Sequence, residues 1–377
     1  MSLTRTIVIL SALALLPAAF GADKNANAII RLLNSRAAGS IASYAEAARI
    51  VAADAKKGRP LQQFVIGLVA EDPLLPADVR ISAEERRRFL DLSRDKIRLL
   101  AESRGNALAW YLLSLEKNNM TYLKRAADGN NVQALNAWGT IRLTAAVADG
   151  DLDPDEAAAR VAEGFECFRK AAETGDANGF YNLGMCYMNG YGCEPDRERA
   201  FDCFRKAAES GHPQAINNIG GFYRDGIVVE PNLEIAAKWF ARSAQMGDPY
   251  GKFNHAMAML RGEGMEKNVE AGIEALKEAA AAGSAEAMCA YGQCLYSGEG
   301  VRKDQRAAMM WYRRSAALGY AQAMDNISVC YSLGAGVDKD SSLSAVWKIR
   351  ARAARGDRNA VAWLIQNGHK LVEPCGF

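Results

Sequence analysis

Glycine recurs at a constant spacing through the second half of this sequence. One series advances in steps of 36 residues and gains one residue at its last step: Gly175, Gly211, Gly247, Gly283, Gly319 and Gly356. A second series keeps the same step inside each unit: Gly190, Gly226, Gly262, Gly298 and Gly334. A period of this length is typical of stacked arrays, in which one unit cannot bury its apolar face without its neighbours. The repeat therefore predicts an array, although a length of 377 residues would otherwise favour separate globular domains.

Each unit begins with the pattern of a helix. Phe180, Leu183, Gly184 and Tyr187 follow the spacing i, i+3, i+4 and i+7, which places them on one helical face. The third position of this stripe is small in every unit: Gly184, Gly220, Ala256, Gly292 and Ser328. A small residue at this position predicts that a second helix approaches closely.

The second helix of each unit follows a turn that contains glycine. Asp or Asn stands at the expected N-cap: Asp196, Asn232, Asn268, Asp304 and Asp340. We expect the helix to end at the closing glycine, because a left-handed cap favours glycine and the preceding basic residues complement the helix dipole. The turn glycines are interpreted as conformational, since no strand precedes them as a phosphate-binding loop would require.

The unit resembles the Sel1-like repeat, a relative of the tetratricopeptide repeat with a slightly longer period. The matching residues lie at Gly298-Glu299-Gly300-Val301, Asp304, Ala307, Trp311-Tyr312, Ala316 and Gly319. The resemblance extends from about Ala157 to Gly368. It implies an all-α fold, a right-handed α/α solenoid of about five regular helical hairpins preceded by degenerate repeats. It also implies a protein-interaction scaffold and no reaction.

The sequence predicts four segments along the chain. Residues 1–21 read as a secretory signal peptide, with Arg5, an apolar run from Ile7 to Leu16, and small residues at 19 and 21 before the expected cleavage. An uncleaved anchor is the alternative, but the apolar run is shorter than the ~20 residues that span a bilayer. Residues 22–129 are expected to form degenerate repeats, 130–368 the regular solenoid and 369–377 a tail. The predicted location is periplasmic or secreted.

The charge of the chain is nearly balanced. The 46 Lys and Arg residues stand against 44 Asp and Glu residues. Such balance gives no electrostatic footprint for nucleic acid, so we expect no nucleic-acid partner. A protein or peptide partner is what the resemblance to the Sel1-like repeat implies. No integral membrane segment is expected after cleavage of the signal peptide, and no cofactor is indicated.

Several of the eight cysteines occupy repeated positions of the predicted core. Cys186, Cys294 and Cys330 share one first-helix position, and Cys167 and Cys203 share a second-helix position. Equivalent helices in neighbouring units lie ~8 to 10 Å apart, beyond the ~7 Å Cα separation that a disulfide allows. We therefore expect mostly free, buried thiols, although a bridge such as Cys167 with Cys186 stays open. The regular bridges of cysteine-rich relatives would need cysteines where this chain has Ala208 and Ala215.

Motifs for catalysis are weak. Ser93-x-x-Lys96 and Ser114-x-x-Lys117 have the serine-lysine spacing of penicillin-recognising enzymes, but the companion motifs of those enzymes are missing. His255 falls on a core stripe, where a partly buried structural imidazole is the favoured interpretation. We predict no catalytic residue and no metal ligand, because the histidines are far apart and no C-x-x-C pair is present.

One polar position beside the core stripe predicts a binding surface. It is filled by asparagine in all regular units except the one with Ala290: Asn182, Asn218, Asn254 and Asn326. An amide has the donor and the acceptor needed to hold an extended peptide backbone, and first helices line the concave surface of such arrays. The alternative is that each asparagine bonds the backbone of the next repeat and stabilises the array.

Two function classes follow. The favoured one is an exported, non-enzymatic scaffold that binds a protein or peptide on its concave surface. The other is a cell-envelope enzyme that acts on a β-lactam or on peptidoglycan, an association implied by resemblance to some secreted, cysteine-rich members of the family.

Overall fold

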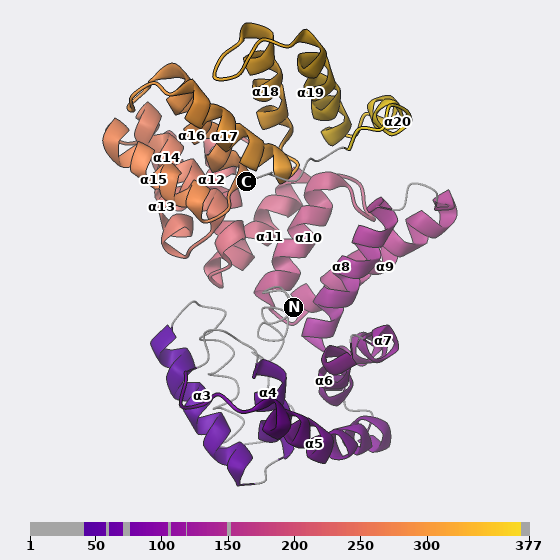
Figure 1. Ribbon diagram of the computed structural model, residues 1–377. Helices are drawn as coiled ribbons and strands as arrows, with labels where there is room; N and C mark the ends of the chain where they lie inside the picture. Colours follow the sequence, from indigo (N-terminus) through magenta and orange to yellow (C-terminus); the bar gives the residue numbers. More distant parts are fainter. Residues whose placement is uncertain are drawn as a thin grey trace. The chain divides into compact units, whose positions relative to one another are not determined.

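The computed structural model describes residues 41–57, 60–70, 76–104, 107–117, 119–148 and 152–370 (Figure 1). Every regular element in these ranges is an α-helix, which confirms the predicted fold class. The predicted signal peptide and most of the predicted tail lie outside the described residues. The chain divides into two compact units, Met1–His212 and Pro213–Phe377, and each is described by itself.

The first unit consists of helices that pack against their neighbours in the chain. They are α3 (Ile41–Lys56), α4 (Pro60–Val69), α5 (Ala83–Arg104), α6 (Ala107–Lys117), α7 (Met120–Asp128), α8 (Val132–Ala148), α9 (Pro154–Glu173), α10 (Ala177–Asn189) and α11 (Arg197–Glu209). Helix α5 starts with a reciprocal capping box. Glu85 N donates to Ser82 Oγ at 3.0 Å, and Ser82 N donates to Glu85 Oε2 at 3.3 Å. The hairpins α8/α9 and α10/α11 have the two-helix architecture predicted from the repeat.

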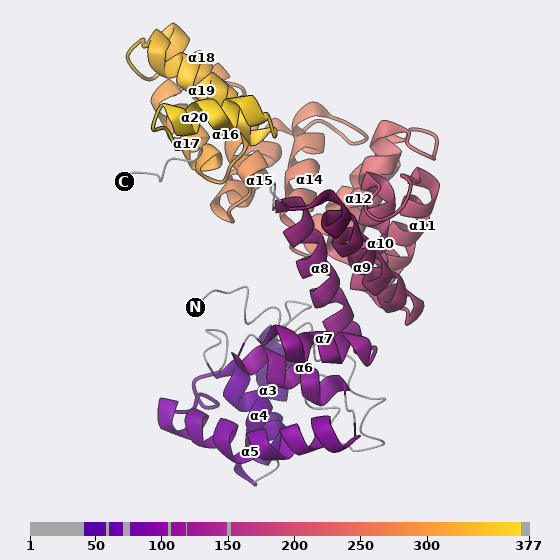
Figure 2. The same cartoon turned by 90° about the vertical axis from the view of Figure 1, so that its right-hand side faces the viewer.

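The second unit continues the same hairpins at the regular period (Figure 2). Its helices are α12 (Pro213–Asp225), α13 (Leu233–Gln245), α14 (Pro249–Arg261), α15 (Val269–Ala281), α16 (Ala285–Ser297), α17 (Gln305–Ala317), α18 (Ala321–Leu333), α19 (Ser341–Ala354) and α20 (Arg358–Gln366). The even-numbered helices α12 to α18 are the first helices of their hairpins. Helix α20 packs against α19.

In several hairpins an aromatic ring of the second helix packs directly on the small residue of the first helix. A Cβ atom added to Gly184 would lie 2.8 Å from the ring of Phe204, and one added to Gly292 would lie 2.8 Å from the ring of Tyr312. The same arrangement joins Gly139 of α8 to Phe168 of α9. The small position is therefore small because a ring of the second helix lies directly on the first, as predicted.

The helix termini follow local sequence. All five predicted Asp and Asn caps accept a hydrogen bond from a backbone N–H in the first turn of the second helix. The closing glycines and the mid-unit glycines all have positive φ, from 64° at Gly226 to 100° at Gly283. This left-handed backbone costs glycine little and other residues more.

The second glycine of the G-x-G turn has an additional role. Gly264, Gly300 and Gly336 each bring their turn against the first turn of the second helix in the preceding hairpin. A Cβ added to Gly300 would lie 2.5 Å from Val269 Cγ1. These glycines are therefore conformational, as predicted, and they also permit the close approach of consecutive hairpins. Val228 occupies the equivalent position with φ 67°, a strained conformation for a β-branched residue.

The described cysteines behave as small apolar residues. Cys167, Cys186, Cys203, Cys289, Cys294 and Cys330 are free and buried, and Cys193 is free and half-buried. Burial raises the pKa of the Cys186 thiol to about 12, with smaller contributions from Cys193 and Cys203. Such thiols are protonated and unreactive near neutral pH. Cys375 lies outside the described residues.

Candidate functional site

The predicted binding asparagines lie on the first helices, on a face we call the first-helix surface. In the first unit it is formed by α8 and α10, and in the second unit by α12, α14, α16 and α18, where α14 contacts both α12 and α16. Asn182, Asn218, Asn254 and Asn326 are all half-buried there. Each side chain is thus partly accessible to a ligand and partly held by the array.

Three of these asparagines donate a hydrogen bond to the preceding hairpin. Asn182 Nδ2 donates to Asn136 Oδ1 at 3.2 Å. Asn254 Nδ2 donates to Asn217 Oδ1 at 2.8 Å, and Asn326 Nδ2 donates to Cys289 Sγ at 3.3 Å. The acceptors are side chains of the preceding first helix, whereas the sequence suggested the backbone of the next repeat. Asn218 has an interaction partner as well.

These bonds leave the oxygen of two of the amides available, whereas Asn326 Oδ1 accepts from Gln322 Nε2 at 3.4 Å. Asn182 Oδ1 and Asn254 Oδ1 accept no hydrogen bond from the residues that the structure describes. An amide that donates within the array and keeps its oxygen open can still accept a hydrogen bond from a ligand. The geometry accommodates both predicted roles of the asparagines, and their ligand-binding role stays a prediction.

The residues that flank the asparagines differ in chemistry from hairpin to hairpin. Helix α14 presents the exposed cation of Arg261, and α16 presents the exposed Gln293. Helix α18 presents two apolar residues, Val329 and Leu333, which are 47% and 65% exposed. A partner that follows the first-helix surface would therefore meet a constant amide position beside a changing neighbour.

Residues of the asparagine row line a pocket in each unit. In the first unit, a pocket of about 340 Å³ lies between α6, α8 and α10 and includes Asn136 and Asn182. In the second unit, a pocket of about 390 Å³ includes Asn254, with Arg224 and Arg261 among its lining residues. Both arginines are paired with neighbouring carboxylates, Asp225 at 2.7 Å and Glu263 at 3.4 Å.

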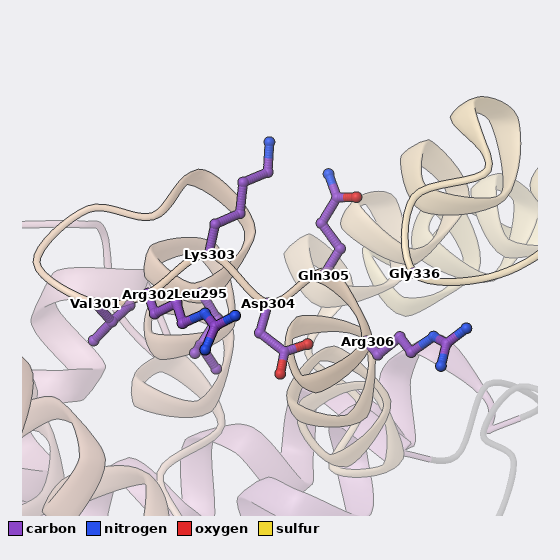
Figure 3. A pocket seen from close by; sticks show the side chains of 8 residues that line it. All are labelled: Leu295, Val301, Arg302, Lys303, Asp304, Gln305, Arg306 and Gly336. Carbon is purple, nitrogen blue, oxygen red and sulfur yellow. The ribbon is translucent and has the colours of Figure 1, made fainter.

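Another hollow lies at the turn before α17. It has a volume of about 800 Å³ and is lined by residues 301–306, Leu295 and Gly336. Figure 3 shows that its long side chains diverge, with Lys303 and Gln305 pointing away from Arg302 and Asp304. Asp304 is occupied as the N-cap of α17, where it accepts from Ala307 N at 2.9 Å. The polar side chains that line this hollow therefore do not point toward a common centre, as those of a ligand site would.

The motifs with a possible catalytic meaning are part of the packing. Ser93 and Ser114 are buried, and their hydroxyls donate to the helix backbone at Phe89 O and Tyr111 O. His255 is half-buried, and burial lowers its pKa. The described part of the chain contains no cluster of three or more potential metal ligands. It also contains no helix with the length and apolar character needed to cross a membrane.

The first helices have caps of their own, which the sequence interpretation missed. Asp176, Asp248, Ser284 and Asp357 each accept a hydrogen bond from a backbone N–H of the helix that follows. Their signal was present in the sequence, because each stands directly after a closing glycine and before a first helix.

Asp248 is the most buried of these caps, with 3% of its surface exposed. Its Oδ2 accepts from Gly251 N at 2.7 Å and from Ser243 Oγ at 3.0 Å. Its Oδ1 is buried without a partner among the described residues. Burial raises the pKa of Asp248 more than these hydrogen bonds lower it.

The raised pKa of Asp248 predicts a pH-dependent difference from the Asp248→Asn variant. The folded state favours the protonated acid, so the wild type loses stability as pH rises from the unfolded pKa of ~4 through the higher folded pKa. Asparagine remains a good N-cap and does not ionise. Between pH 4 and 7 the free energy of unfolding should therefore shift in favour of the variant, by about 1.4 kcal/mol for each unit by which the pKa is raised. Melting temperatures of both forms across this pH range measure the shift. Asp196→Asn, at the N-cap of α11, is the matched control, and an equal drift there would contradict the explanation.

Consecutive helical hairpins that repeat at a fixed period define this chain as a repeat protein of the α-solenoid class. Six Sel1 repeats match this chain, at residues 161–176, 181–212, 213–248, 249–284, 285–320 and 321–351. The chain belongs to the Sel1-like repeat family. Sel1 repeats generally mediate protein interactions and form non-enzymatic scaffolds.

Several solved structures are similar to this chain. A Sel1 repeat protein from Oxalobacter formigenes is 25% identical, covers 69% of this chain and 99% of its own, and superposes with a TM-score of 0.52. The protective antigen c5321 of uropathogenic Escherichia coli is 21% identical over 90% of this chain and 79% of its own, with a TM-score of 0.40. Immunity protein Pa5087 of Pseudomonas aeruginosa is 20% identical over 59% of this chain and 83% of its own, with a TM-score of 0.44. A comparison with curated proteins gives no match.

Proposed function

We propose that this chain is an exported, non-enzymatic scaffold that holds a protein or peptide partner on its first-helix surface. The observation that carries the proposal is the row of half-buried asparagines at one repeated position. A constant amide suits the constant chemistry of a peptide backbone, while varied neighbours such as Arg261 and Leu333 suit the side chains that differ along a partner. Export is supported by the signal-peptide pattern of residues 1–21, and it places the partner in the periplasm or outside the cell.

The double variant Asn218→Ala with Asn254→Ala tests the proposal. A partner is first recovered from the envelope fraction of the producing cell, purified and titrated against both forms of the scaffold. If the asparagines bind the partner, removing two neutral hydrogen bonds of about 1 kcal/mol each should weaken binding on the order of tenfold to thirtyfold. The melting temperature should fall by only a few degrees, because the double variant removes the amide bond from Asn254 to Asn217 and the side-chain interaction of Asn218, and both asparagines are half-buried.

The control for this experiment lies on a second helix of the same unit. Lys238 and Gln245 of α13 are both exposed, so Lys238→Ala with Gln245→Ala removes two polar side chains away from the first-helix surface. Partner affinity should be unchanged in this control. If binding by the asparagine variant falls only in proportion to its loss of folded protein, the asparagines serve the array and the proposed binding mode is wrong.

A further inference from the structure

The pocket of the first unit has one charged residue in an otherwise neutral lining. Its apolar part is formed by Tyr111 of α6 and by Ala137 and Ile141 of α8. Its polar part consists of Gln133, Asn136, Thr140, Asp176, Asn178 and Asn182. At about 340 Å³ it lies near the lower end of the ~300 to 1,000 Å³ typical of ligand sites, so it suits a single long side chain better than a helix or a cofactor.

Hydrogen bonds connect several of the side chains that line the pocket. Both hydrogens of Asn136 Nδ2 are used, one on Val132 O at 3.1 Å and one on Asp176 Oδ2 at 2.8 Å. Asn136 Oδ1 accepts from Asn182 Nδ2, and Thr140 Oγ1 donates to Asn136 O at 2.9 Å. Asn182 Oδ1 accepts from none of the described residues. Within this network the amide of Asn136 has no donor left, and Asn182 Oδ1 is an open acceptor at the pocket that Asp176 also lines.

The carboxylate of Asp176 is half-buried and accepts two hydrogen bonds. Its Oδ2 accepts from Gly179 N at 2.8 Å and from Asn136 Nδ2, and Oδ1 takes part in neither bond. Burial raises the pKa of Asp176, against the lowering effect of these hydrogen bonds. A negative charge that has lost water gains more from a nearby cation than an exposed one does, because the local dielectric is lower.

We infer that this pocket receives the side chain of a lysine or arginine from the partner polypeptide. The aliphatic stem would pack on Tyr111, Ala137 and Ile141, and the cationic head would donate to Asp176 and to Asn182 Oδ1. The more exposed amide of Asn178 lies at the same pocket and can bond the backbone beside the inserted residue. This inference rests on the proposed function and adds the chemical class of one anchoring residue.

The test uses the full chain and blocked pentapeptides with the sequence Gly-Gly-X-Gly-Gly, where X is lysine, arginine, norleucine or glutamate. Binding is followed through the NMR signals of the side-chain amides of Asn136, Asn178 and Asn182. The lysine or arginine peptide should shift these signals with a dissociation constant at least about tenfold lower than that of the norleucine peptide. The glutamate peptide should bind no better than norleucine.

The variant Asp176→Asn removes the charge and keeps a good N-cap for α10, so the chain is expected to fold. It should abolish the preference for the basic peptides. Asp196→Asn in α11 removes a capping charge that does not line the pocket, and it should leave the preference intact. Equal binding of norleucine, or a basic preference that survives in Asp176→Asn, would overturn the inference.

A random peptide library panned against the chain separates this inference from the proposed function. Recovered peptides enriched in lysine or arginine, which lose binding in Asp176→Asn, support both. Recovered peptides that carry no basic residue and leave the three pocket amides unshifted overturn the inference while the scaffold function stands. Recovery of no peptide, together with no response to any pentapeptide, contradicts both.

Discussion

Replacing Gly264 with alanine is expected to lower the stability of the second unit by at least about 3 kcal/mol. The added Cβ would lie 2.6 Å from Glu234 N and closer still to Leu233 O, and neither backbone atom can move without displacing the start of α13. The φ of 71° adds the cost of a left-handed alanine, about 1 to 2 kcal/mol. Because Gly264 couples neighbouring hairpins, thermal unfolding followed by circular dichroism should also lose cooperativity.

The variant Gly247→Ala is the matched control for Gly264→Ala. Gly247 has a φ of 87°, but no atom lies within 4 Å of the position of an added Cβ. Its loss should be limited to the backbone strain of about 1 to 2 kcal/mol. Equal losses in the two variants would show that the turn does not press on α13, and that the second glycine serves its own backbone alone.

The sequence predicted the hairpins well because their determinants are local. A cap such as Asp304 needs only the first turn of its own helix, and a closing glycine needs only its own φ. The small position above Phe204 was also predictable, since the period places the two helices of a unit against each other. In each case the residues that interact lie within one repeat.

Contacts between hairpins were less accessible to sequence reasoning. The sequence analysis interpreted the second glycine of the turn through its backbone conformation alone. Nothing in the sequence of one hairpin indicates that Gly264 contacts Leu233 of the preceding hairpin. The acceptor Asn136 was missed for a related reason. The longer segment between α8 and α10 shifts it out of the 36-residue period, so only the packed structure brings it to Asn182.

Val228 stands where the repeat predicts a glycine, and its backbone conformation is strained. Glycine stands at the equivalent place in the other hairpins, at Gly192, Gly264, Gly300 and Gly336, and Val228 adopts the same left-handed backbone. A strained β-branched residue of this kind costs on the order of 1 to 3 kcal/mol. The Val228 side chain is 47% exposed, so the burial of this side chain is only partial.

The C-terminal part of the second unit depends on one buried arginine that the sequence did not single out. Arg350 of α19 is 2% exposed, its guanidinium lies 4.5 Å from the ring centroid of Trp347, and its Nε donates to Lys370 O at 3.0 Å. The start of the predicted tail, at Lys370, is therefore hydrogen-bonded to Arg350 of the last hairpin. Since the guanidinium is held by neighbours and shielded from water, its loss leaves buried groups without their partner.

We expect Arg350→Met to destabilise α20 and the residues that follow it by about 2 to 4 kcal/mol, because methionine fills similar space but cannot donate to Lys370 O. Hydrogen exchange of the α20 amides should accelerate roughly thirtyfold or more at this cost, from the conversion of 1.4 kcal/mol per tenfold. Arg352→Met is the control on the same helix. Arg352 is exposed and pairs with Asp357 at 2.6 Å, so its loss should cost no more than about 1 kcal/mol. Similar exchange rates in the two variants would show that Arg350 does not hold the end of the array.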